Sequence, residues 1–541
     1  MGALNNVAAI NASGFFLARE VDVSRSADIT DTTDTLKVLL TAQEVYPAME
    51  RAFLSAEQEI SAGYRVFDLA TKLRSDEGLA IGEDWFDLIV HVLRKGVRMK
   101  FVISDFDAVL APKLHFNSWK TRRAFVAARE VAGKGAQLVV TNAAHSAKVG
   151  ILPRIFLWPR LIKEVNKVAA KLNDMTSDQA ARRLECSPGV RPLLRRTPDG
   201  TYTAKRWPIP SLIPGTHHQK ICVIDRQTAF VGGLDLNERR YDDKNHDRER
   251  SETWQDVQLR CTGPVAKDVH SHLEEFLDVV AGTRAPTAEG RLLRTLSRRR
   301  KTDWPFLGPK PLVHTIADDH HRLVQRARGL IYLETQFLRD RPLCNRLAEA
   351  AAKNPSLKLI IVVPGAPEEV AFDGQTGSDV KFGEYLQATC VDILRKSFGA
   401  RMTICSPVRP KSLDTGERDT LWGSPIIYVH SKVSIFDCDR AIVSSANLNG
   451  RSMLWDTEAG VLLNDQSEVE SLRDRIFRHW LGADAGPEFY AADSAVELWA
   501  ERARRNAEVA PEKRRGFLVP YDVEPARKFG RRLPGIPDAM V

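Results

Sequence analysis

Two distant stretches of the chain share one pattern of histidine, lysine and aspartate, in the spacing H-x-K-x-x-x-x-D. An imidazole can act as a nucleophile or as an acid and base, and a lysine ammonium can neutralise an anion. The two copies consist of His218, Lys220 and Asp225, and of His430, Lys432 and Asp437. Because both copies stand in similar flanks, we interpret them as one duplicated chemical unit rather than as chance matches.

The duplication extends beyond the motif itself. Residues 218–240 align without a gap onto residues 430–452, with identical or apolar-for-apolar residues at most positions. The segments ICVI and VSIF are apolar and rich in β-branched residues, which predicts a strand in each copy. Since residues i and i+2 face the same side of a strand, His218 and Lys220 project together, and the same holds for the second copy. If the halves pack about a pseudo-twofold axis, four basic side chains meet in one cleft, and a phosphate is their natural occupant.

The elements that must position these residues alternate between helix and strand. Helical spacing of apolar residues changes to a short apolar strand within residues 48–69, 85–107, 321–338 and 346–365. This alternation is typical of an α/β fold, and the second half repeats the first. Proline, glycine and charge in residues 281–311 predict a connector. We therefore expect an N-terminal extension (1–41), a first repeat (42–280), a linker (281–311), a second repeat (312–485) and a C-terminal basic extension (486–541).

Composition is that of an ordinary folded protein. The chain has 541 residues, of which 43% are hydrophobic and 27% charged, which is enough to bury a large core. The formal net charge of +8 favours an anionic partner without choosing between phospholipid and nucleic acid. Seven scattered cysteines without a C-x-x-C pair indicate a reducing site of synthesis. We expect neither a membrane-spanning helix nor a secretory signal, since a long apolar run and a basic N-terminal region are both missing.

The doubled motif and its flanks resemble the phospholipase D superfamily over most of residues 42–480. The flanks that resemble catalytic blocks of its phosphatidylcholine-hydrolysing branch are HHQKICVIDRQTAFVGGLDLNERRYDD (217–243), WQDVQLRCTGPVAKDV (254–269), IYLETQF (331–337) and YVHSKVSIFDCDRAIVSSANLNGRSML (428–454). The resemblance implies two α/β/α sandwich repeats related by a pseudo-twofold axis, which form one catalytic body with the site on their seam. It also implies hydrolysis of a phospholipid to phosphatidic acid and free headgroup, with transphosphatidylation when a primary alcohol replaces water.

The same resemblance implies roles for the central residues. His218 would attack phosphorus and become a phosphohistidine, while His430 would protonate the leaving alcohol and then activate water. The near-symmetry of the two copies leaves this order open. Lys220 and Lys432 would neutralise the phosphate oxygens, and no pattern in the sequence requires a metal or another cofactor. The family places carboxylates that orient the histidines at the positions of Asp256 and Glu458.

Further residues complete the expected site. Asp225 and Asp437 belong to the motif and count among the catalytic residues, but their odd spacing from the histidines predicts that they face away and hold the turn after each strand. Asn447 matches the family asparagine that donates to phosphate, whereas the corresponding Asp235 would repel phosphate unless it is turned away. The other expected substrate-binding residues are Asn237, Asn449 and Gln336, with Glu334 in a supporting position.

The expected partner is the surface of a phospholipid membrane, touched peripherally, with a glycerophospholipid and water or a primary alcohol as reactants. The segment LPRIFLWPRL (152–161) would touch a membrane through Phe156 and Trp158, but burial against the first repeat is the expectation. The run RRRK (298–301) either adds about 1 kcal/mol per charge at an anionic lipid surface or forms a solvated loop. We expect the chain in the cytoplasm at synthesis, with export that needs no signal peptide left open.

Three other functions remain open. A nuclease of the same superfamily would reuse both histidines, although nucleic acid is the less expected partner. A phosphatidyl transferase resembling cardiolipin synthase would form the same intermediate. A non-catalytic protein that binds anionic lipid is the third alternative, and the intact histidines, lysines and aspartates in both copies argue against it.

Overall fold

Two mixed β-sheets organise the part of the chain that the computed structural model describes, which is residues 35–287, 290–302 and 304–541. Most of the expected N-terminal extension, residues 1–41, lies outside the described residues. The first sheet contains, in spatial order, β1 (Leu36–Leu40), β9 (Val257–Thr262), β8 (Thr228–Gly232), β7 (Lys220–Ile224), β2 (Glu59–Tyr64), β3 (Arg98–Ser104) and β4 (Leu138–Ala143). The second contains β11 (Lys310–His314), β10 (Leu292–Arg298), β19 (Glu458–Leu463), β18 (Arg440–Ser444), β17 (Lys432–Phe436), β12 (Leu330–Thr335), β13 (Lys358–Val362), β14 (Met402–Pro407) and β20 (Leu518–Pro520).

Seven strands of the second sheet repeat the order and direction of the first. The motif strand is central in each sheet, antiparallel to both of its neighbours: β7 lies between β2 and β8, and β17 lies between β12 and β18. In each sheet two further strands continue in parallel from β2 or β12. The α/β class and the repeated architecture are therefore confirmed, and the duplication reaches from the motif to the whole sheet.

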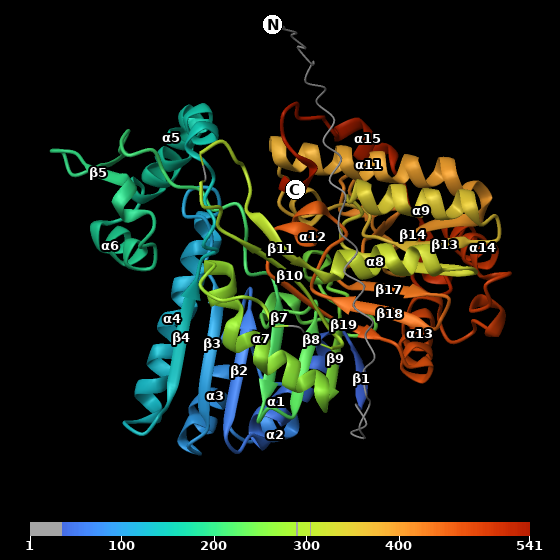
Figure 1. Ribbon diagram of the computed structural model, residues 1–541, viewed down its shortest axis with the longest axis horizontal. Coiled ribbons are helices and arrows are strands. Elements are labelled where there is room, and N and C mark those ends of the chain that lie inside the picture. Colours follow the sequence, from blue (N-terminus) through green and yellow to red (C-terminus); the bar gives the residue numbers. More distant parts are fainter. Residues whose placement is uncertain (1–34, 288–289, 303) are drawn as a thin grey trace, which may run out of the picture. The chain divides into compact units, whose positions relative to one another are not determined.

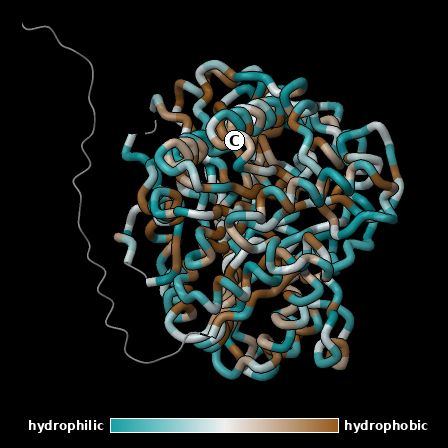
Figure 2. The backbone as a smooth tube through the Cα atoms, turned by 90° about the vertical axis from the view of Figure 1, so that its right-hand side faces the viewer, coloured by the Kyte–Doolittle hydropathy of each residue, from teal (hydrophilic) through white to brown (hydrophobic). Residues whose placement is uncertain are grey.

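Helices cover the sheets in layers (Figure 1). One core joins the first sheet to α1 (Thr41–Ser55), α3 (Trp85–Arg94) and α4 (Pro112–Ala132). A second core joins the other sheet to α8 (Thr315–Arg326), α9 (Arg341–Lys353) and α11 (Ser378–Phe398). A third core is shared by both sheets with α7 (Pro264–Ala281), α13 (Gln466–Leu481) and α14 (Ala495–Glu508). Figure 2 shows the corresponding hydrophobic stretches running through the interior.

Alternation along the motif strand explains how one strand serves two cores. Ile221 and Val223 contribute to the core shared by the two sheets, whereas Cys222 and Ile224 contribute to the core under α1, α3 and α4. Successive side chains of a strand point to opposite faces, so an uninterrupted apolar run is required where both faces are covered. His218 therefore precedes a stretch of strand that is buried on both faces.

The segments flanking the second repeat take part in its sheet. Strand β10 lies inside residues 281–311, which we expected to be a linker, and it pairs with β19 as β1 pairs with β9. Proline and glycine occur in the loops on either side of β10, and these loops produced the connector-like composition. In the C-terminal extension, β20 pairs with β14 and α14 packs into the shared core. The domain boundaries themselves stay a prediction.

The first repeat contains an insertion that the second lacks. Between β4 and β7 lie α5 (Ile151–Asn173), α6 (Ser177–Glu185), β5 (Leu194–Arg196) and β6 (Tyr202–Ala204), packed around a small core of their own. The corresponding connection between β14 and β17 contains only the short hairpin of β15 (Thr420–Leu421) and β16 (Ser424–Pro425). None of the helices among the described residues combines the length and apolar character needed to cross a membrane.

Candidate active site

The two motif histidines lie on the seam between the repeats, each bonded through its backbone to the opposite repeat. His218 donates its backbone N–H to the carbonyl of Thr457 at 2.8 Å, and His430 donates its own to the carbonyl of Gln255 at 2.8 Å. The matched parallel bridges His217–Thr457 and Gln255–Val429 accompany these bonds. Because these contacts are reciprocal, the two motif segments are related by a pseudo-twofold axis that lies between them.

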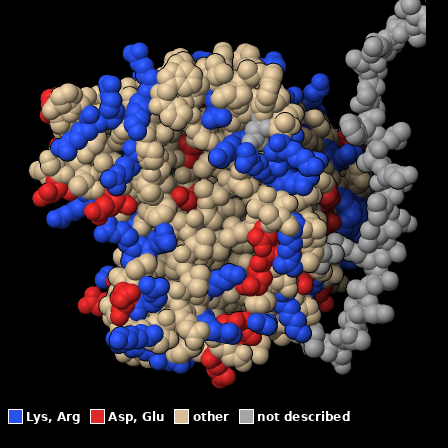
Figure 3. Space-filling view, turned by 60° about the vertical axis from the view of Figure 1, so that its left-hand side comes forward, with Lys and Arg blue, Asp and Glu red and all other residues tan. Residues whose placement is uncertain are grey.

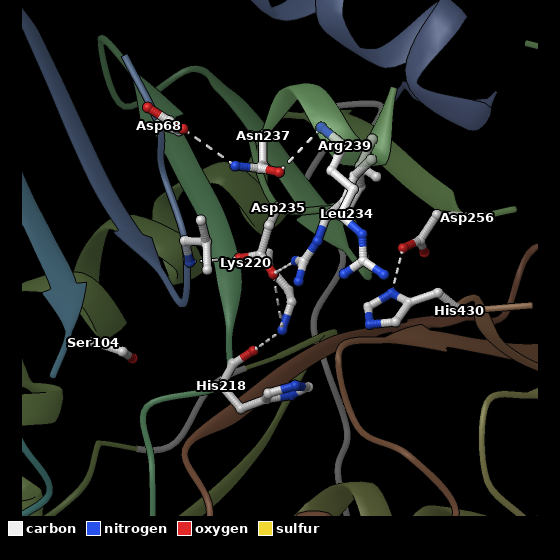
Figure 4. A network of polar contacts seen from close by, with 12 residues as sticks. Asp68, Ser104, His218, Lys220, Leu234, Asp235, Asn237, Arg239, Asp256 and His430 are labelled. Carbon is white, nitrogen blue, oxygen red and sulfur yellow. Dashed lines mark hydrogen bonds and ion pairs between the residues drawn. The ribbon is translucent and has the colours of Figure 1, made fainter. Parts of the chain in front are cut away.

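Each imidazole is paired with a carboxylate from the other repeat. His430 Nδ1 lies 2.6 Å from Oδ2 of Asp256, a contact drawn as a dashed line in Figure 4, and His218 Nδ1 lies 3.0 Å from a carboxylate oxygen of Glu458. A carboxylate on Nδ1 fixes the ring orientation and leaves Nε2 to face a reactant. Asp256 and Glu458 thus lie beside the histidines, as expected for orienting groups. Each carboxylate contacts the histidine of the other repeat.

The two imidazole rings and the two carboxylates are almost completely buried. His218 is 9% exposed and His430 is 2% exposed, whereas Asp256 and Glu458 are fully covered. Burial lowers the pKa of both imidazoles well below 6.5, and the charges of Lys220 and Lys432 lower each of them further. Because both lysines act on both rings, the four basic side chains share one electrostatic environment. Burial also raises the pKa of Asp256 to about 6 and that of Glu458 to about 8.

The motif lysines are held beside their own histidines. Lys220 Nζ donates to the carbonyl oxygen of His218, and Lys432 Nζ donates to that of His430. Burial lowers the pKa of Lys220 to about 8 and that of Lys432 to about 7, against the attraction of nearby carboxylates. Two desolvated ammonium groups next to two imidazoles form a site suited to a phosphate anion, whose charge would restore the protonated state of both lysines.

Asp235 is turned toward cations. Its carboxylate accepts a hydrogen bond from Arg240 and one of 2.8 Å from the backbone N–H of Val66, and it lies 3.8 Å from Lys220 Nζ (Figure 4). Burial raises the pKa of Asp235, but Lys220, Arg240 and Arg65 outweigh burial and lower it overall. The repulsion of phosphate that the sequence suggested is therefore offset by neighbouring positive charge.

The amide side chains named in the sequence have different surroundings. Asn237 caps the turn that follows β8 and donates to Asp68 at 3.3 Å (Figure 4), and Asn449 caps α12 (Gly450–Leu454). Gln336 donates to the hydroxyl of Tyr428 at 2.8 Å. Asn447 is 5% exposed, and its side-chain oxygen has no hydrogen-bond partner among the described residues. A direct contact of these four with substrate stays a prediction, and the described residues leave the buried side-chain oxygen of Asn447 unpaired.

Glu334 lies behind the second motif. Its carboxylate accepts hydrogen bonds from Tyr332 at 2.6 Å, from Trp480 at 2.7 Å and from Ser431. Burial raises its pKa, while these three donors oppose that rise. Since Ser431 is the residue between His430 and Lys432, Glu334 supports the backbone of the motif without meeting the reacting atoms.

The motif aspartates lie at the far end of their strands. Asp225 accepts hydrogen bonds of 2.8 Å from three successive backbone N–H groups, those of residues 57, 58 and 59, where β2 begins. Asp437 accepts from residues 328, 329 and 330, where β12 begins. Both have a positive φ, near +50°, which aspartate tolerates better than most residues. Their observed contacts are structural, and a direct part in chemistry is not needed to explain their place in the motif.

Replacing Asp437 by alanine is expected to lower the free energy of unfolding by about 2 to 3 kcal/mol, because the change removes bonds to three N–H groups and strains a left-handed backbone. Urea denaturation followed by tryptophan fluorescence measures this change. Asp439→Ala is the matched control two residues later, since the exposed side chain of Asp439 forms an ion pair with Arg440 at 3.6 Å. Equal midpoints for the two variants would contradict the structural role.

Sequence reasoning missed cations near the motif, Arg65 among them. Arg65 follows β2, and the preceding Tyr64 pairs in register with Lys220 just as Thr335 pairs with Lys432. Its guanidinium lies 5.5 Å from the ring centre of Phe106, and its charge helps to lower the pKa of His218. The available signal was a charged residue directly after an apolar strand beside the motif strand.

Comparison with known proteins gives consistent similarities. A family model described as "Cardiolipin synthase, PLD-like domain" matches residues 321–480. Phospholipase D1 of Saccharomyces cerevisiae is 23% identical over 380 residues, which cover 50% of this chain and 22% of that protein. Phospholipase D2 of Bos taurus is 23% identical over 420 residues, covering 54% and 45% respectively. Among solved structures, phosphatidylserine synthase of Haemophilus influenzae matches with a TM-score of 0.48 and 12% identity, covering 82% of this chain and 86% of that one.

The doubled motif, the family model and the curated relatives identify the class: the chain belongs to the phospholipase D superfamily. The alignments span less than half of the length of the two curated relatives, 22% of the yeast protein and 45% of the bovine one. Because the similarity covers only part of these relatives, the reaction and the substrate of this protein are matters of proposal.

Proposed function

We propose that this protein is a phospholipase D that hydrolyses the distal phosphodiester of glycerophospholipids such as phosphatidylcholine, at a membrane surface that it touches peripherally. The observation that carries the proposal is the reciprocal pair of imidazole–carboxylate contacts, His218 with Glu458 and His430 with Asp256, closed around two buried lysines. Relatives named phospholipase D support the choice of a phospholipid substrate.

The proposed reaction proceeds in two displacements at phosphorus. Nε2 of His218 attacks, a P–N bond forms, and the P–O bond to the headgroup breaks while His430 gives its proton to the leaving oxygen. Water then attacks the phosphohistidine, His430 takes its proton, and the P–N bond breaks to release phosphatidic acid. Lys220 and Lys432 hold the phosphate oxygens through both steps, where exclusion of water strengthens their charge.

The order of the two histidines is the open part of this scheme. The raised pKa of Glu458 keeps one proton on the His218–Glu458 pair in the free site, whereas the pair of His430 with Asp256 loses its proton at lower pH. Attack by His218 requires the proton to leave that first pair. Family resemblance favours His218 as the nucleophile, and acid-quenched trapping of a labelled phosphohistidine distinguishes it from His430.

We expect a bell-shaped dependence of kcat/KM on pH, with an acid limb at about pH 6 and an alkaline limb at about pH 8. Whichever imidazole attacks, the reactive site holds one proton between its two imidazole–carboxylate pairs. Below the first limb both pairs are protonated and no ring nitrogen is free to attack, and above the second limb neither pair can protonate the leaving oxygen. Lys432 and Lys220 have pKa values of about 7 and about 8, so both also lose their charge as the pH rises. This loss makes the alkaline limb of the profile steeper.

A soluble phosphodiester assayed from about pH 5 to about pH 9 tests this profile. Glu458→Gln cannot hold the extra proton, so its alkaline limb is expected to move to lower pH. A rate that rises steadily through the whole range would contradict a requirement for one shared proton.

A transferase is the second candidate, because the matching family model carries the name cardiolipin synthase. In that reaction the hydroxyl of a second lipid would replace water in the second displacement, and the same residues would serve. Phosphatidylglycerol vesicles distinguish the two outcomes, since both reactions release glycerol but a transferase converts the lipid to cardiolipin and a hydrolase converts it to phosphatidic acid.

One parallel experiment tests the proposed function. The full chain is incubated with phosphatidylcholine vesicles, with the same vesicles plus a primary alcohol, and with duplex DNA, and an inactive His430→Ala variant is run beside it. Choline release with formation of a phosphatidyl-alcohol supports the proposal. Nicked DNA with unchanged vesicles would overturn it in favour of a nuclease.

A further inference from the structure

The insertion of the first repeat carries an apolar surface that its own core leaves uncovered. We expected residues 152–161 to be buried, and this was wrong for the first turns of α5, where Phe156 is 85% exposed. The buried stripe of α5 begins at Leu161 and continues through Val165 and Ala169 at helical spacing. The helix therefore extends beyond the small core it packs on, and its N-terminal half projects apolar side chains outward.

Two other segments of the chain add to this surface. Leu152 donates its backbone N–H to the carbonyl of Trp304 at 3.2 Å, which holds the loop after β10 against the start of α5. On the other side, the rings of Trp158 and Trp207 lie 4.9 Å apart. We define the α5 patch as the six most exposed large apolar residues of these three segments, namely Leu152, Ile155, Phe156, Trp207, Trp304 and Phe306, each between 41% and 85% exposed.

Basic residues predominate along the segments that form the α5 patch. Residues 148–163, 200–224 and 304–317 contain lysine and arginine but neither aspartate nor glutamate, and the run RRRK (298–301) lies shortly before Trp304 in the sequence, whereas Glu164, Asp199 and Asp303 mark the ends of these basic stretches. On the face drawn in Figure 3, Lys and Arg side chains flank uncharged surface at the upper edge. Apolar side chains inside a basic border match a bilayer that contains anionic lipid.

Nucleic acid fits the α5 patch less well. Single-stranded nucleic acid is bound by aromatic rings on which bases stack, and the aliphatic side chains of Leu152 and Ile155 cannot provide such a platform. Aliphatic and aromatic side chains together are what the boundary between headgroups and acyl chains accepts. The mixed composition therefore favours lipid.

The α5 patch is linked to the active site by a short stretch of chain. His218 follows Trp207 by eleven positions, which corresponds to at most about 40 Å when the chain is fully extended. This stretch is tied down by a bond from Val149 N–H to the carbonyl of Leu212 at 2.9 Å, and by one from Thr216 N–H to Asp456 at 2.7 Å. A bilayer seated on the α5 patch would thus present its lipids within reach of the site.

We propose that the α5 patch docks this protein onto the surface of a bilayer that contains anionic phospholipid, with Phe156 as its most deeply inserted side chain. The basic residues around the patch attract the anionic headgroups, and the apolar side chains enter the boundary above the acyl chains. The link to turnover rests on the proposed function, whereas the docking itself is a binding property that is measured without turnover.

Co-sedimentation of the full chain with vesicles tests this proposal. All proteins carry His430→Ala, so that hydrolysis cannot change the lipid during the assay. The patch variant is Phe156→Ser with Trp304→Ser, and the control is Leu79→Ser with Val139→Ser, two apolar residues that are 56% and 59% exposed outside the patch. On vesicles of phosphatidylcholine with phosphatidylglycerol, the patch variant is expected to bind at least tenfold more weakly, while the control binds like the parent.

Binding by the parent protein is also expected to fall when phosphatidylglycerol is omitted and when salt is raised. Equal binding by the patch variant and the control would overturn the proposal. A loss of duplex DNA binding, or of self-association, in the patch variant with unchanged vesicle binding would overturn it in favour of those occupants. If phospholipid turnover were absent but patch-dependent binding remained, the proposed function would fail and the docking surface would stand.

Discussion

Alanine in place of His218 is expected to remove phosphodiester cleavage almost entirely, with kcat lowered by at least about 10⁴-fold. The change removes the proposed nucleophile, and the buried lysines alone cannot form a covalent intermediate. His430→Ala is expected to be as inactive on a lipid substrate, because the headgroup alcohol then leaves without a proton. Both variants are measured by headgroup release, with His314→Ala, a half-exposed histidine outside the site, as the control.

Acid quenching after mixing with a phosphorus-labelled phosphodiester distinguishes the two roles. The wild type is expected to yield a labelled phosphohistidine, and His218→Ala none. With a nitrophenyl phosphodiester, whose leaving group departs unprotonated, His430→Ala is expected to accumulate the label because its second displacement lacks a base. Label found on residue 430 instead of 218 would reverse the assigned order, and a wild type that never carries label would contradict covalent catalysis.

The second large effect is expected from replacing the two carboxylates that contact a histidine of the opposite repeat. Glu458→Gln and Asp256→Asn should each lower turnover of a lipid substrate by about 10² to 10⁴-fold, because a neutral amide no longer stabilises the charge and orientation of its imidazole. The structure assigns Glu458 to His218 and Asp256 to His430. The two variants should therefore differ in the step that they slow.

The nitrophenyl phosphodiester separates these steps. Glu458→Gln is expected to slow formation of the phosphohistidine, whereas Asp256→Asn should form it at a rate close to that of the wild type and then hydrolyse it slowly. Glu249→Gln serves as an exposed control for the loss of a carboxylate in the same region of the first repeat. If Asp256→Asn slowed formation instead, the cross-repeat assignment or the order of the histidines would be wrong.

Local geometry explains why much of the fold could be predicted. The helix and strand periods in residues 48–69 and 346–365 depend on neighbours in sequence, and the structure has α1 with β2 and α9 with β13 there. The motif also depends on sequence neighbours, because successive side chains of a strand point to opposite faces and Asp225 is an odd number of residues from His218. This spacing indicates that Asp225 lies away from His218. The composition of residues 281–311 was misleading, because loops rich in proline and glycine on both sides concealed β10.

The sequence alone determined that an imidazole and a lysine occur together twice, on two strands of a duplicated α/β unit, since strand alternation acts over a few residues. Only the tertiary structure decided that Glu458 contacts His218 and Asp256 contacts His430, because residues 240 and 174 positions apart meet across the seam. It also decided the exposure of Phe156. An amphipathic or apolar helix looks the same in sequence whether its end lies on a core or beyond it, because burial depends on what the rest of the chain places there.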